Sequence, residues 1–68
     1  MTFTIESEQE TDGRWLAEVR EIPGVLAYGQ TAPEAIAKVE AFALRVLADR
    51  LEHGEPAPMP ISISFAMA

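Results

Sequence analysis

The sequence predicts an α+β fold in which one helix packs on one face of a four-stranded mixed sheet. Three short runs with the alternation of β-strands precede residue 31, and a long helical pattern opens with a capping motif at Thr31. A last alternating run follows a proline-rich connector. The predicted order is therefore βββαβ, in one domain spanning residues 1–68.

The first two predicted strands form a hairpin. Phe3 and Ile5 alternate with polar residues, so residues 2–8 are expected to form a half-buried strand. The Asp12-Gly13 step favours a turn because glycine accepts positive φ without strain. A second strand over residues 14–20 then pairs antiparallel to the first. Its alternation places on one face Trp15, Ala17 and Val19.

The third predicted strand begins after a second turn. Proline presets φ and glycine supplies the left-handed position after it, so Pro23-Gly24 predicts a type II turn. Residues 25–30 then return as a strand, which completes a meander. Gly29, near the end of this strand, indicates either a bulge or a close approach of another backbone segment.

A helix is predicted from Thr31 to about His53. The T-x-x-E pattern of Thr31 and Glu34 is a capping box, and Pro33 falls in the first turn, where its missing N–H costs nothing. Gly54 fits the C′ position. The apolar arc of this helix covers roughly 200°, more than one sheet face needs. Part of it is therefore expected near solvent or at a subunit contact.

The last strand is predicted over residues 61–65, after a connector stiffened by three prolines. A right-handed crossover through the helix sets it parallel to the first strand, which gives the strand order 3-2-1-4.

The helix covers one face only. Trp15 is expected on that face, in the core, with a role as an interface anchor as the alternative. Some of the other face should be buried by a second copy; it carries Leu16, Leu26 and Tyr28.

The composition of the chain limits the kinds of stabilisation and of partner that are expected. The chain has 68 residues and no cysteine, so neither disulfides nor thiolate metal sites stabilise it, and self-association to a homodimer or larger is expected. A net charge of −6 repels nucleic acid and suits a basic protein partner. No signal peptide and no apolar run of bilayer-spanning length is visible, so a cytoplasmic location is expected.

No catalytic, cofactor-binding or metal-ligating residue is predicted. The one histidine, His53, falls at the helix C-terminus, where a capping role is expected. Several carboxylates of the first strand and hairpin suggest a magnesium-dependent nuclease as the enzymatic alternative, using Glu6, Glu8 or Asp12. No histidine accompanies them, and Gly24 and Gly29 do not match a nucleotide-binding glycine pattern. A protein without enzymatic activity is therefore predicted.

Taken in order, these motifs resemble the N-terminal domain of HicB antitoxins. The resemblance rests on the Asp12-Gly13 hairpin, the segment Glu21-Ile22-Pro23-Gly24-Val25, the pattern Gly29-x-Thr31-x-x-Glu34-Ala35, and Gly54 followed by Pro58 and Pro60. It covers nearly the whole chain. The family's fold is a partial ribonuclease-H-like βββαβ unit, and its members commonly form dimers or larger oligomers.

The resemblance implies a protein-binding function. HicB antitoxins bind a small, basic, RNA-cleaving toxin, HicA, and block its active site, while a separate C-terminal domain binds operator DNA. This chain stops at Ala68, so no DNA-binding domain and no direct nucleic-acid contact are expected. The alternative is a stand-alone oligomeric regulatory or ligand-binding domain. The residues predicted to bind a partner are Glu6, Glu8, Glu10, Asp12 and Tyr28.

Overall fold

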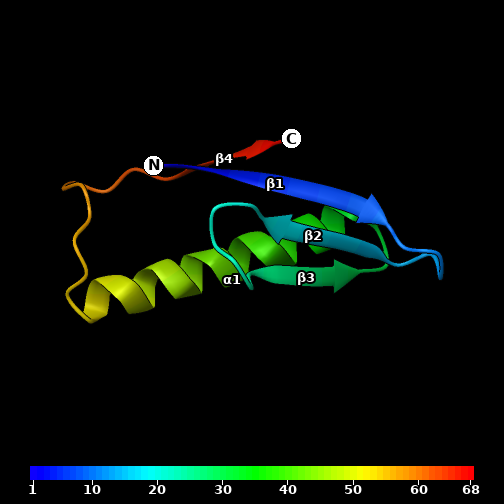
Figure 1. Ribbon diagram of the computed structural model, residues 1–68, viewed down its shortest axis with the longest axis horizontal. Coiled ribbons are helices and arrows are strands. Elements are labelled where there is room, and N and C mark those ends of the chain that lie inside the picture. Colours follow the sequence, from blue (N-terminus) through cyan, green and yellow to red (C-terminus); the bar gives the residue numbers. More distant parts are fainter.

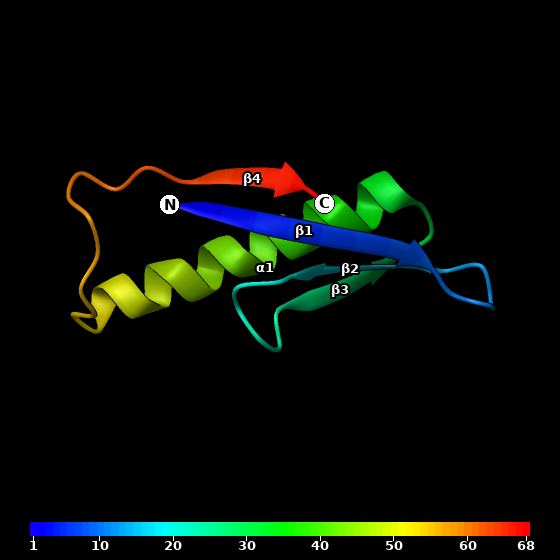
Figure 2. The ribbon, with the colours of Figure 1, turned by 45° about the horizontal axis from the view of Figure 1, so that its top comes forward.

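A single helix lies against one face of a four-stranded sheet in the computed structural model, which describes residues 1–68 (Figure 1). The elements are β1 (Thr2–Gln9), β2 (Trp15–Val19), β3 (Leu26–Gly29), α1 (Ala32–Glu52) and β4 (Ser64–Met67). The strand order is β3-β2-β1-β4, which confirms the predicted order. Figure 2 shows α1 passing behind the sheet, with β4 beside β1.

Pairing within the sheet is mixed. β1 pairs antiparallel with β2, and β2 antiparallel with β3, whereas β4 returns parallel to β1 through the helical crossover. The predicted meander and the predicted parallel fourth strand are both confirmed. α1 lacks the continuous apolar length that a bilayer-spanning helix requires.

Both predicted turns form, each around a glycine with positive φ. In the hairpin between β1 and β2, Gly13 has φ +91° and its N–H donates to the carbonyl of Glu10. In the second turn Gly24 has φ +87° and the N–H of Val25 donates to the carbonyl of Ile22, as in a type II turn. This second turn sends both flanking side chains, Ile22 and Val25, into the core.

The helix begins and ends at local motifs. Thr31 is the N-cap, in an extended conformation, and its hydroxyl accepts from the N–H of Glu34 at 3.2 Å. The Glu34 carboxylate accepts from Lys38 at 2.9 Å and not from the amide of Thr31, so only one half of the predicted capping box forms. At the other end, Gly54 and Glu55 donate to carbonyls of the last turn in a Schellman arrangement.

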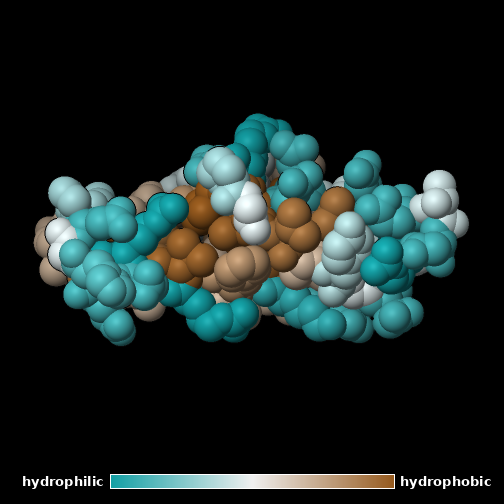
Figure 3. Space-filling model, turned by 60° about the horizontal axis from the view of Figure 1, so that its bottom comes forward, coloured by the Kyte–Doolittle hydropathy of each residue, from teal (hydrophilic) through white to brown (hydrophobic).

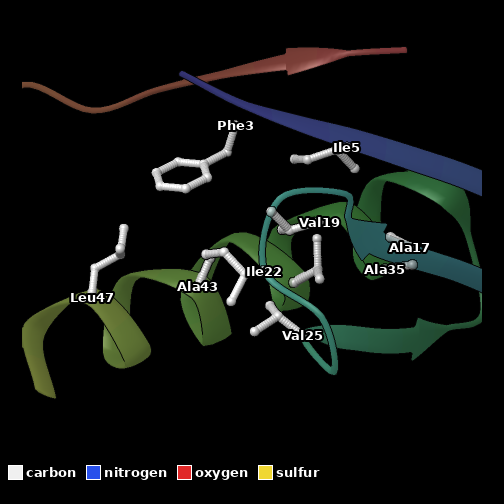
Figure 4. Packing of buried hydrophobic residues seen from close by; sticks show 10 residues of the cluster. Phe3, Ile5, Ala17, Val19, Ile22, Val25, Ala35, Ala43 and Leu47 are labelled. Atoms are coloured by element: carbon white, nitrogen blue, oxygen red, sulfur yellow. The ribbon is translucent and has the colours of Figure 1, made fainter. Parts of the chain in front are cut away.

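The core fills the layer between α1 and the sheet (Figure 4). Its members are Phe3, Ile5, Ala17, Val19, Ile22, Val25, Ala35, Val39, Ala43 and Leu47. Trp15 packs against this cluster from the helix-covered face and is partly buried, in agreement with its predicted core position. On the β4 side, the rings of Phe3 and Phe65 lie 6.0 Å apart between their centroids.

Helix and sheet approach most closely at Gly29. A Cβ built on Gly29 would lie 2.6 Å from the backbone nitrogen of Ala35. The first turn of α1 therefore rests directly on β3, and only glycine leaves room for it. Of the two predicted interpretations of Gly29, the close approach is confirmed.

The fourth strand lies further along the chain than predicted. It spans Ser64–Met67, whereas the alternation placed it at residues 61–65. β1 begins at Thr2, which pairs with Ser64, so no strand residue is available to pair with Ile61. Two terminal hydrogen bonds extend the contact, from the Met1 ammonium to the Ser62 carbonyl and from the Ser64 N–H to the Met1 carbonyl. Alternation thus located the element but not its bounds.

Candidate protein-binding face of the sheet

The face of the sheet opposite α1 is not covered by any other part of the chain. We call it the open face and define it by the outward side chains of its three meander strands, Glu6, Glu8, Leu16, Glu18, Leu26 and Tyr28. These residues alternate with the core residues of the same strands, which is why they share one side. Leu26 and Tyr28 are 41% and 39% exposed, which is large for apolar and aromatic side chains on a strand.

The strand register arranges these side chains in two rows across the sheet. One row runs from Glu8 through Leu16 to Tyr28. The other runs from Glu6 through Glu18 to Leu26. Directly opposed side chains on neighbouring strands have Cβ atoms roughly 4.5–5.5 Å apart, so each row forms a continuous surface. Each row is acidic on the β1 side and apolar or aromatic on the β3 side.

Three carboxylates surround a shallow depression on the acidic side. It has a volume of about 100 Å³ and is lined by Glu6, Ser7, Glu8, Leu16 and Glu18. Glu6 stands opposite Glu18, a like-charge pair, and is partly neutralised by Arg20, whose Nε donates to it at 2.6 Å. This hydrogen bond raises the pKa of the Arg20 guanidinium. Glu8 and Glu18 make no ion pair, so their charges are available to a partner.

Tyr28 is linked to the hairpin through Arg14. The guanidinium carbon of Arg14 lies 4.5 Å from the centroid of the Tyr28 ring, in a cation–π contact. The same guanidinium donates from Nε to Asp12 at 2.7 Å. Asp12 also accepts the backbone N–H of Arg14, and these hydrogen bonds hold the pKa of Asp12 below its ordinary value. Asp12 thus orders the turn and positions Arg14 over Tyr28.

The structure brings together only part of the predicted partner-binding set. Glu6, Glu8 and Tyr28 share the open face. Asp12 lies in the adjoining turn, and Glu10 bonds through its backbone N–H and carbonyl within the hairpin loop. Glu18 also lies on the open face, although the predicted set does not include it. The antiparallel hairpin supplied a signal for it, because its register places Glu18 opposite Glu6.

Another carboxylate, Glu21, has a structural role. Both of its oxygens accept from Thr4, one from the backbone N–H and one from the hydroxyl, each at 2.7 Å. Since β2 ends at Val19, Glu21 satisfies a β1 amide that lies beyond the end of its neighbouring strand. These bonds, led by that from the Thr4 amide, hold the pKa of Glu21 below its ordinary value.

The remaining polar residues do not assemble a second site. No three acidic or histidine side chains come together in an arrangement that could hold a metal ion. His53 caps the end of α1, where its Nδ1 lies 2.7 Å from the carbonyl oxygen of Asp49, in agreement with its predicted position.

An apolar area lies on the side of the molecule that carries β3 and α1. Figure 3 views the molecule from the side on which β3 and α1 lie in Figure 1 and shows apolar atoms gathered across the middle of that side. The exposed Leu26 belongs to this strand, and Phe42 and Val46 of α1 are partly buried against the core. The acidic half of the open face therefore adjoins an apolar half.

Comparison with family models, with curated proteins and with solved structures gives no significant match. The fold and the face together define an α+β domain with one covered and one open side of its sheet.

Proposed function

We propose that this chain is a protein-binding domain of the HicB-like antitoxin type, which masks a small, basic, RNA-cleaving toxin of the HicA type. One observation carries the proposal: the open face combines unpaired carboxylates with exposed apolar and aromatic side chains. A surface of this kind fits a protein partner that presents basic side chains around an apolar contact. The ordered motifs that resemble HicB antitoxins support the same function.

The two halves of the open face have different tasks in this proposal. Tyr28 and Leu16 are the central anchors, because aromatic and apolar groups that lose water on binding contribute most of the affinity. Glu8 and Glu18 attract lysine and arginine side chains of the toxin and increase the association rate. Masking needs no chemistry from this chain, since a bound protein excludes RNA from the toxin's active site.

The test is the association rate with a candidate HicA-like toxin at two salt concentrations. Charge steering is screened over a Debye length of about 8 Å at physiological ionic strength, so the wild-type rate is expected to fall as salt rises. A Glu8→Lys/Glu18→Lys variant is expected to associate more slowly, with a weaker salt dependence. The same comparison for Glu8→Lys/Glu10→Lys shows whether the hairpin contributes.

The matched control is Asp49→Lys/Glu55→Lys, which changes the net charge equally but at the C-terminal end of α1. It is expected to affect association less than the open-face variant does. Equal losses in both double variants would show that only net charge matters and would reject the open face as the interface. RNA cleavage by the purified chain alone would reject the antitoxin function.

A stand-alone regulatory domain without a toxin is the second candidate. The one depression with mostly apolar walls lies between the end of α1 and the connector, and includes Leu47, Leu51 and Ile61 in its lining. Its volume of about 100 Å³ is well below the roughly 300–1,000 Å³ typical of small-molecule sites. A regulatory role would therefore operate through protein contacts and not through a ligand.

A further inference from the structure

The side of α1 that faces away from the sheet carries an apolar stripe. It consists of Ala37, Ala41, Leu44, Ala48 and Leu51, which we call the outer stripe. All five residues are exposed, and the two leucines are 46% and 38% exposed. At 100° per residue the five side chains occupy an arc of about 80° on the helix circumference. The centre of this arc lies roughly 140° from the centre of the buried side chains of the same helix. The core therefore does not account for them.

The spacing of the outer stripe is that of a helix–helix contact. Successive members are separated by four, three, four and three residues, which is the heptad pattern of a packed helix pair. No charged residue interrupts it. Glu40 borders it on one side, and Lys38, Arg45 and Glu52 border it on the other. These charges flank the stripe without entering it, so its five members form an uninterrupted apolar strip on the exposed side of the helix.

We infer that the outer stripe binds the same stripe of a second copy, with the two helices antiparallel about a two-fold axis. In a register offset from full overlap, which leaves Ala37 beyond the contact, Leu51 faces the partner's Ala41 and Leu44 faces the partner's Ala48. The axis repeats both pairs, so each of the four layers contains one leucine and one alanine. Large residues set against small ones fill such a contact evenly and let the helices approach closely.

Charge is compatible with the same arrangement. The antiparallel register brings Lys38 next to the partner's Glu52 at both ends of the contact and sets the two Arg45 side chains against each other at its middle, so the leucine–alanine layers, and not charge, select the orientation. A parallel pair in register would instead stack leucine on leucine and alanine on alanine. Its layers would alternate between two large and two small side chains, which fills the contact less evenly.

The open face is a poorer contact for a second copy. A two-fold axis there would bring Glu6, Glu8 and Glu18 of both copies onto one surface, and like charges brought together at an interface are unfavourable. Contact through α1 leaves both open faces directed outward, on opposite sides of the dimer. The inference does not depend on the proposed function, but it would give such a dimer two toxin-binding faces.

Sedimentation equilibrium over a range of concentrations tests the association. The wild type is expected to form a dimer of twice the 7.4 kDa chain mass. A contact between two single helices is small beside the roughly 800 Å² per partner of a stable interface, so the dimer is expected to dissociate on dilution. Leu44→Glu is expected to weaken dimerisation at least tenfold, while its circular dichroism spectrum stays that of the wild type, because Leu44 is outside the core.

The matched control is Leu26→Glu, the same substitution at a leucine of similar exposure on the open face. It is expected to keep the wild-type dimerisation constant. A wild type that remains monomeric at every concentration overturns the inference. So does a Leu44→Glu variant that dimerises normally, or a loss of dimer in Leu26→Glu that matches the loss in Leu44→Glu.

Cross-linking tests the orientation, and the chain suits it because it has no cysteine. Ala41→Cys and Leu51→Cys proteins are expected to form a disulfide when mixed under mild oxidation, but not when either is oxidised alone. In the antiparallel register two copies of residue 41 are about 15 Å apart along the axis, beyond the reach of a disulfide. Cross-linking of either protein alone, or none in the mixture while both variants still dimerise, overturns the antiparallel arrangement.

Discussion

At the scale of single residues, the segment between β2 and α1 depends on a backbone conformation and on a cap. Gly24 has φ +87°, and a Cβ added there would meet no atom within 4 Å. The obstacle to a side chain is therefore the left-handed backbone itself, which costs about 1–2 kcal/mol for ordinary residues and more for β-branched ones. The side chain of Thr31 supplies one hydrogen bond to the first turn of α1.

Gly24→Val is accordingly expected to destabilise the fold more than Thr31→Ala, whose lost cap typically costs ~1 kcal/mol. Urea melts of both variants give the two free energies of unfolding. Gly24→Asn is the matched control, because asparagine tolerates the left-handed region and should be milder than valine. A Gly24→Val variant as stable as Thr31→Ala would contradict the type II turn.

Residues differed in how far the sequence alone could predict their roles. The turn at Gly24 and the cap at Thr31 depend on neighbours within three residues, so local chemistry identified both. The role of Glu21 depends on Thr4, a residue 17 positions earlier, and no local pattern announces it. Glu18 is intermediate: the alternation of the hairpin places it on the open side of β2, but the carboxylate beside it, Glu6, belongs to another strand.

At the scale of elements, the closest packing is that of α1 on β3. Gly29 has no positive φ, yet a Cβ on it would overlap the backbone of Ala35 at 2.6 Å. Backbone cannot move aside as a flexible side chain can, so the whole first turn of α1 would have to shift. Helix position, and not local conformation, is what this glycine determines.

Gly29→Ala is therefore expected to cost more stability than Gly13→Ala, although only Gly13 has positive φ. Overpacking typically costs 1–3 kcal/mol, and a backbone collision belongs at the upper end of about that range. Chemical denaturation of the two variants provides the comparison. If Gly13→Ala were the more damaging, the helix would not rest on β3 as the structure describes.

Elements were predicted well where the signal was periodic and poorly at their ends. The helix was placed within a residue or two, because capping and termination signals mark both ends. β4 was predicted too early in the chain. Residues 61–63 carry the alternation of a strand, but no residue of β1 lies beside them to pair with them. The bounds of an edge strand are determined by the strand beside it, which a local pattern does not contain.

At the scale of the whole molecule, topology followed from the order of elements and from the hand of crossovers. That reasoning gave the order β3-β2-β1-β4 and left one face of the sheet open, as the structure has it. The order of elements did not show which carboxylates of this acidic chain accept hydrogen bonds within the fold. Asp12, Glu21 and Glu34 each accept hydrogen bonds within the fold, whereas Glu8 and Glu18 accept none.

These engaged carboxylates predict acid sensitivity. The pKa of Asp12, of Glu21 and of Glu34 is lowered, in the last case mainly because the Lys38 ammonium donates to the carboxylate. A group whose pKa is lower in the folded chain than in the unfolded chain binds fewer protons when folded. Its stabilisation is present in full above the ordinary carboxyl pKa, about 4, and is lost as the pH falls through the lowered value. The free energy of unfolding is therefore expected to decline below about pH 4.5.

Urea melts from pH 7 to pH 3 measure this decline, and Glu21→Gln isolates one contribution. The amide cannot titrate, so this variant is expected to be less stable than the wild type at pH 7 and to lose less stability on acidification. Glu8→Gln is the matched control, since Glu8 accepts no hydrogen bond in the fold, and the wild-type pH dependence is expected for it. A Glu21→Gln variant with the full wild-type pH dependence would mean that the bond between Glu21 and Thr4 does not hold the N-terminal part of β1 in solution.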